Sequence, residues 1–155
     1  MQDQSVGRDG DVDGIAALIF GESRAVLLEG EAGVGKSAVL AALGRRLESS
    51  GRVASRVFGA AGARDLPLAP FSHLMKQWTP GDSPGAVVVE LLLVLERRAE
   101  RDGMVLLVDD VQHLDDVSLA VLHQLVSHGS VPLVVTRRVD DACPTSSKDC
   151  AHRGA

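Results

Sequence analysis

Residues 25–37 of this 155-residue chain, AVLLEGEAGVGKS, decide its fold. Residues 25–28 are typical of a buried strand, and apolar residues at helical spacing after Lys36 predict a helix. The loop between them must turn its backbone N–H groups inward, which glycines at 30, 33 and 35 allow without Cβ clashes. The P-loop pattern G-x-x-x-x-G-K-[ST] is matched by Gly30, Gly35, Lys36 and Ser37. The stretch therefore predicts a strand, a phosphate-binding loop and a helix.

This loop carries the groups that bind a nucleoside triphosphate. A phosphate at the start of the following helix would meet unpaired amides and the positive end of the helix dipole. Lys36 would reach the β- and γ-phosphates, and the Ser37 hydroxyl would bind Mg²⁺. A chance glycine-rich turn is the alternative for so short a pattern, but the strand before it and the helix after it favour nucleotide binding.

A second apolar run, residues 104–108, ends in Asp109 and Asp110. Parallel strands present ligand-binding groups at their carboxyl ends, so this is the position of a Walker B carboxylate. Asp109 would hold Mg²⁺ directly or through water. Asp110 would either orient the attacking water or lie in the second layer of groups around Mg²⁺, because it is one methylene shorter than the Glu often used as a base. Lys36 and Asp110 are the two candidate catalytic residues.

A further apolar segment, residues 131–135, ends in Thr136, Arg137 and Arg138. The forked guanidinium of Arg suits phosphate, so Thr136 with either arginine could sense the γ-phosphate. For either arginine taken alone, a solvated side chain at a strand end is an equally good interpretation. The nearby His113 is interpreted as a packing or loop residue and not as a proton carrier.

Strands and helices alternate through residues 1–138, which predicts one α/β domain. The expected architecture is a P-loop NTPase three-layer sandwich with a mainly parallel four-stranded sheet. The other expected elements are helices over 13–20, 71–78, 87–101 and 115–127 and a strand over 52–58. Residues 139–155 lack an apolar period and are expected to form a disordered tail.

The composition excludes several classes of function. The chain is 45% hydrophobic but 3% aromatic, which suits a Val-, Leu- and Ala-rich α/β core. Its net charge of −5, from 16 basic and 21 acidic residues, argues against a nucleic-acid-binding surface in these residues. The longest apolar run, residues 86–95, contains Glu90 and is too short to span a bilayer, and no export segment is recognisable. We therefore expect no membrane partner and a cytoplasmic location.

Together these segments resemble the nucleotide-binding ATPase module of the large LuxR-type transcriptional regulators, within the STAND class of P-loop ATPases. The similar segments, in order, are VGRD at 6–9, VLLEGEAGVGKSAVLAAL at 26–43, LPLAPF at 66–71, VLLVDDVQHLDDVSLAVLHQL at 105–125 and PLVVTRR at 132–138. The resemblance covers about residues 5–138.

The resemblance implies a switch that binds or hydrolyses ATP, with Gly7 and Arg8 near the adenine or ribose and Thr136 with a following arginine as sensor. The expected nucleotide contacts are Gly7, Arg8, Gly30, Glu31, Ala32, Gly33, Val34, Gly35, Lys36, Ser37, Ala38, Thr136 and Arg138. The expected Mg²⁺ ligands are Ser37 and Asp109. Such regulators bind DNA through a C-terminal helix-turn-helix domain, which these residues do not contain.

The resemblance also places the P-loop strand between the sensor strand and a fifth strand that this sequence lacks. Residues 25–29 are therefore expected at an exposed apolar sheet edge, which favours self-association. The alternative function is that of a truncated, non-catalytic fragment that acts only through protein contacts or has no function. A small-molecule kinase is a weaker alternative, because no acceptor-site or lid motif follows Asp110.

Overall fold

The computed structural model describes residues 8–21, 23–31, 33, 35–75 and 83–139. Helices and strands alternate along these residues. The helices are α1 (Arg8–Phe20), α2 (Lys36–Ser49), α3 (Pro84–Asp102) and α4 (Asp116–His128). The strands are β1 (Ala25–Gly30), β2 (Ala54–Phe58), β3 (Val105–Asp109) and β4 (Leu133–Arg138). Short 3₁₀ turns are η1 (Ala61–Ala63), η2 (Ala69–Leu74) and η3 (Val111–His113).

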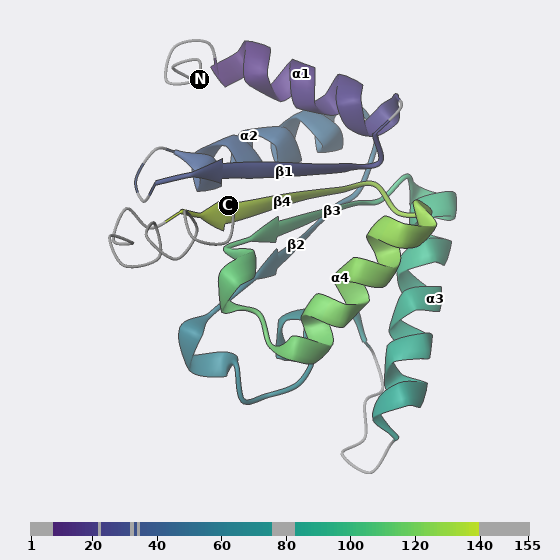
Figure 1. Cartoon of the computed structure of the whole chain (residues 1–155). Coiled ribbons are helices and arrows are strands. Elements are labelled where there is room, and N and C mark those ends of the chain that lie inside the picture. Colours follow the sequence, from purple (N-terminus) through teal and green to yellow (C-terminus); the bar gives the residue numbers. More distant parts are fainter. Residues whose placement is uncertain (1–7, 22, 32, 34, 76–82, 140–155) are drawn as a thin grey trace, which may run out of the picture.

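The four strands form one sheet in the order β1-β4-β3-β2, and every pairing between them is parallel. Helices α1 and α2 lie on one face of the sheet, and α3 and α4 cover the other (Figure 1). The predicted three-layer α/β architecture with a parallel four-stranded sheet is therefore confirmed.

Strand β3 is buried along its whole length because its side chains alternate between two cores. Leu106 and Val108 contact the core beneath α3 and α4, whereas Val105 and Leu107 contact the core beneath α1 and α2. A strand covered on both faces needs apolar residues at every position. This requirement explains the uninterrupted apolar run that precedes Asp109.

Strand β1 lies at one edge of the sheet and pairs only with β4 among the described strands. Leu27 in this strand is 52% exposed. The sequence prediction that residues 25–29 form an apolar edge is confirmed for the described part of the chain.

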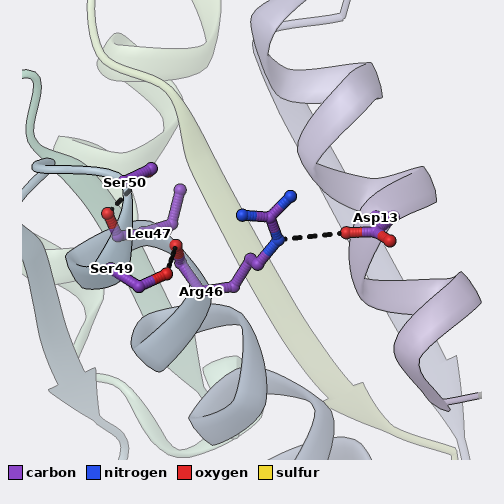
Figure 2. A network of polar contacts seen from close by, with 5 residues as sticks. All are labelled: Asp13, Arg46, Leu47, Ser49 and Ser50. Carbon is purple, nitrogen blue, oxygen red and sulfur yellow. Dashed lines mark hydrogen bonds and ion pairs between the residues drawn. The ribbon is translucent and has the colours of Figure 1, made fainter.

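Helix α1 is held against α2 mainly by apolar contacts. The shared core contains Val12, Ile15, Ile19, Leu40, Leu43 and Leu47. Figure 2 shows the polar contacts beside it, where Arg46 Nε lies 3.2 Å from Asp13 Oδ1. The Ser49 and Ser50 hydroxyls donate to the carbonyls of Arg46 and Leu47. Because Asp13 and Arg46 are more than half exposed, their ion pair contributes at most about 1 kcal/mol.

Several element boundaries differ from the sequence predictions. Helix α1 begins at Arg8 and not at residue 13, because Val12 already belongs to the buried face. In place of a helix over 71–78, the structure has the 3₁₀ turn η2, with Pro70 at its start; residues 76–78 lie outside the described ranges. Strands β2 and β4 begin two residues later than predicted, at Ala54 and Leu133.

Asp115 joins the start of α4 to the loop before η2. Its Oδ1 accepts hydrogen bonds from the Ser118 amide at 2.8 Å and from the Leu68 amide at 3.3 Å. Its Oδ2 accepts from the Ser118 hydroxyl at 2.6 Å. Asp115 is buried, so all three donors would lose their partner inside the protein if the carboxylate were removed.

We therefore expect Asp115→Ala to lower the free energy of unfolding by about 2–4 kcal/mol, since it removes a helix N-cap and leaves buried donors without a partner. Urea unfolding followed by circular dichroism measures the change. The adjacent Asp116, which is exposed, is the control: Asp116→Ala should cost no more than about 1 kcal/mol. Equal losses for the two variants would contradict this account of Asp115.

Candidate functional site

The carboxyl edge of the sheet brings three predicted segments together. The loop after β1, the Asp109–Asp110 pair at the end of β3 and the end of β4 all lie at this edge. The helix after β1 lies on one face of the sheet, and the helix after β3 lies on the other (Figure 1). Open parallel sheets bind ligands where their connections diverge in this way.

The loop between β1 and α2 has the backbone that its glycines predict at two of three positions. Gly33 and Gly35 have φ values of 82° and 90°, in the left-handed region that favours glycine. Gly30 is the last residue of β1 and has no such φ value, so its place in the pattern is not explained by a positive φ. Helix α2 begins directly after Gly35, so the amides of Lys36, Ser37 and Ala38 have no partner within the helix.

The Lys36 ammonium is held by the carbonyls at the start of this loop. Its Nζ donates to Gly30 O at 2.7 Å and to Glu31 O at 2.6 Å. Gly30 O also accepts from the amide of Val139, just after β4, at 3.0 Å. Lys36 would therefore have to break at least one of these two bonds in order to reach a phosphate.

Asp109 is a buried carboxylate at the carboxyl end of β3, with 7% of its surface exposed. The Thr136 hydroxyl donates to Asp109 Oδ1 at 2.5 Å and accepts from the Asp110 amide at 2.9 Å. Thr136 is itself fully buried. One hydroxyl thus fixes the orientation of Asp109 and ties the Asp109–Asp110 turn to β4.

Asp110 has a left-handed backbone, with φ of 55°, which is uncommon for a residue with a side chain. Gly59, just after β2, allows this turn to lie close. A Cβ at Gly59 would lie 2.2 Å from the carbonyl oxygen of Asp110, so any other residue would displace the turn. The Gly59 amide donates to Asp109 O at 2.9 Å. The local sequence does not mark Gly59 as a site residue, because its role depends on this contact between two strand ends.

Gln112 is a second site residue that the sequence pattern does not identify. Its side-chain Nε2 donates to Asp110 Oδ1 at 3.3 Å, and its Oε1 accepts from the Arg138 amide at 3.2 Å. Gln112 lies in η3, directly after the acidic pair, and nothing in the sequence pattern distinguishes it from an ordinary turn residue. His113 follows it, with its Cβ close to Gly59, which agrees with its interpretation as a loop residue.

The two arginines at the end of β4 have different surroundings. Arg137 lies beside Glu29 in the β1–β4 register, and its Nη1 is 3.5 Å from Glu29 Oε1. Arg138 lies beside Gly30, the first residue of the P-loop pattern. The Arg138 amide faces away from β1 and bonds to Gln112, whereas the next amide, that of Val139, bonds to Gly30 O.

The donors fit a Mg²⁺ ion that arrives with a nucleotide. Asp109 offers one carboxylate, whose Oδ2 accepts no hydrogen bond from the described residues, and Ser37 is an exposed hydroxyl at the start of α2. No cluster of three or more His, Cys, Asp or Glu side chains that could hold a metal occurs in the described ranges. Mg²⁺ is commonly held by one or two carboxylates plus phosphate oxygens and water, so an all-protein cage is not required.

Some predicted contacts remain predictions. Gly7, Ala32 and Val34 lie outside the described residues, and Arg8 is the first residue of α1. Glu31, Gly33 and Ala38 are exposed around the loop. Across residues 8–75 and 83–139, apart from the short gaps, no helix has the length and apolar character needed to cross a membrane.

Residues 4–80 match the AAA ATPase domain. No curated protein sequence matches the chain. Among solved structures, C. elegans PCH-2 is similar with a TM-score of 0.51 and 17% identity, over 94% of this chain and 40% of that one. AMPPCP-bound DnaA from Aquifex aeolicus is similar with a TM-score of 0.53 and 16% identity, over 97% of this chain and 43% of that one.

The chain therefore spans about two-fifths of the length of these two proteins. At this level of identity the structural likeness concerns the fold, and the match over residues 4–80 concerns the part that contains the P-loop. We conclude that the chain has the fold of AAA+ P-loop NTPases and is similar to the AAA ATPase domain over residues 4–80.

Proposed function

We propose that this chain is an ATP–Mg²⁺-binding switch module of a LuxR-type transcriptional regulator of the STAND class. The observation that carries nucleotide binding is the meeting, at one sheet edge, of a P-loop that leads into a helix and a buried carboxylate at the end of the central strand. The AAA ATPase domain match and the likeness to AMPPCP-bound DnaA support the same proposal.

Each group at this edge has a role in that proposal. The amides at the start of α2 would hold the phosphates, and Lys36 would exchange at least one of its two carbonyl partners for β- and γ-phosphate oxygens. Mg²⁺ would neutralise phosphate charge between Ser37 and Asp109. Thr136 would keep Asp109 oriented, and Arg138 would approach the γ-phosphate from the end of β4.

Hydrolysis would require Asp110 to orient water. Its carboxylate is placed by Gln112, and its backbone is placed by Thr136. The regulator role rests on the sequence resemblance, and DNA binding would belong to a helix-turn-helix domain outside these residues. The cytoplasm, where such regulators act, is the proposed location.

Lys36→Met is the first test. Loss of a charged phosphate contact should weaken ATP binding by about 10- to 100-fold, measured by isothermal titration calorimetry with Mg²⁺. The matched control is Arg45→Met on the exposed side of α2, which removes one positive charge from the same helix and should leave the affinity within about twofold of wild type. Thermal unfolding of each variant verifies that Lys36→Met still folds after losing its contacts with the loop carbonyls. Equal ATP affinities for wild type and a folded Lys36→Met protein would contradict the proposal.

The acidic pair is tested with isosteric amides. Mg²⁺ should raise the ATP affinity of wild type but not that of Asp109→Asn, because the metal loses its charged protein ligand. If Asp110 orients the attacking water, Asp110→Asn should keep wild-type ATP affinity and lower phosphate release about 100-fold or more. Unchanged phosphate release in Asp110→Asn would contradict a catalytic role for Asp110.

The open edge of β1 favours a second activity, self-association. The backbone N–H and C=O groups of residues 25, 27 and 29 face away from β4. This follows from the alternation along the strand, because the Leu133 amide bonds to Arg24 O and the Val139 amide bonds to Gly30 O. We propose that two copies pair through this edge, with the exposed Leu27 near the contact. In this alternative the chain acts through protein contacts and does not need nucleotide.

Leu27→Lys should therefore abolish concentration-dependent association in sedimentation velocity, because a charge at an edge strand opposes pairing. Val89→Lys is the control, since Val89 is similarly exposed, at 57%, but lies on α3. If wild type and both variants sediment identically at all concentrations, pairing through β1 is wrong.

A further inference from the structure

Strand β4 runs beyond the end of its ladder with β3. The β3–β4 register ends at Val108 and Val135, and β3 itself ends one residue later. The backbone groups of β4 that face β3 beyond this point need other partners. Gln112 Oε1 supplies one of them by accepting from the Arg138 amide, while the Thr136 hydroxyl of β4 accepts from the Asp110 amide that follows β3.

Gln112 is suited to this place because a primary amide both donates and accepts. Its Oε1 takes the Arg138 amide proton, while its Nε2 donates to Asp110 Oδ1. A carboxylate at position 112 could accept but not donate, and a lysine could donate but not accept. The bond to Asp110 is partly buried, so water competes for it less than at an open surface, whereas the bond from the Arg138 amide is exposed.

The backbone of Asp110 needs such support. A left-handed conformation at a residue other than glycine persists where its surroundings hold it. Gly59 restricts the Asp110 carbonyl from one side, and Thr136 holds its amide from the other. Neither contact fixes the direction of the carboxylate, which is the part that would act on water or Mg²⁺. Gln112 supplies that contact.

We infer that Gln112 is a positioning residue that fixes the carboxylate of Asp110 relative to the Arg138 end of β4. The inference goes beyond the nucleotide contacts and rests on the proposed function only for its consequence. The consequence is that Arg138, near the γ-phosphate, and Asp110, which orients water, keep a fixed position relative to each other.

The first experiment needs no nucleotide. In ligand-free protein, amide hydrogen exchange at Arg138 is followed by NMR for wild type, Gln112→Leu, Asp110→Gly and the double variant. Glycine at 110 keeps the positive φ accessible while it removes the carboxylate. Gln124→Leu, on the exposed side of α4, is the control for losing a glutamine.

Gln112→Leu should speed exchange at Arg138 roughly fivefold through loss of its acceptor. Asp110→Gly should also speed it, because Gln112 then loses its second anchor, and the double variant should be no faster than Gln112→Leu alone. The control should match wild type. If Asp110→Gly leaves Arg138 exchange unchanged, or if the two changes simply add, the coupling through Gln112 is absent.

The second experiment tests the consequence at the site. Gln112→Leu should lower phosphate release roughly tenfold while its ATP affinity stays within about twofold of wild type, and in the Asp110→Gly background it should have no further effect. A fall in ATP affinity that matches the fall in phosphate release would show a general disturbance and overturn the inference. If wild type binds no ATP, the proposed function fails, and the Arg138 exchange result alone decides the inference.

Discussion

The buried carboxylate of Asp109 is the constraint on which the site depends. A charge at the end of a fully buried strand is costly unless a donor meets it, and the Thr136 hydroxyl does so at 2.5 Å. The same hydroxyl accepts the Asp110 amide, so β3 and β4 are joined by a side chain where their backbone ladder stops. Because β4 also pairs with β1 as far as Gly30, this contact sets the acidic pair in register with the start of the P-loop.

Much of this arrangement follows from the sequence. The apolar run before Asp109 predicts a strand buried on both faces, and the glycines at 33 and 35 predict the left-handed turns that they adopt. Strand and helix alternation predicts the parallel sheet, and the parallel sheet predicts that the P-loop, the acidic pair and Thr136 meet at one edge. These features could be predicted because each depends on local residue type or on a general rule of strand order.

Other features depend on contacts between segments far apart in the chain. Gly59 is needed because its strand end lies against the Asp110 carbonyl, and no local pattern reports that approach. Gln112 has a role only because β4 extends past β3 and leaves the Arg138 amide facing η3. The Lys36 bonds to Gly30 O and Glu31 O likewise follow from the folded loop and not from the motif, which describes the lysine as a phosphate ligand.

The central claim is that this sheet edge binds the phosphates of ATP, and Lys36 must then leave at least one loop carbonyl. The most direct measurement is a two-dimensional NMR titration of the labelled protein with AMPPCP and Mg²⁺. The account predicts that the largest shifts occur at the amides of Gly33, Gly35, Lys36 and Ser37, with smaller shifts at Asp110 and Arg138. Shifts confined to other parts of the chain, or no shifts at millimolar AMPPCP, would contradict it.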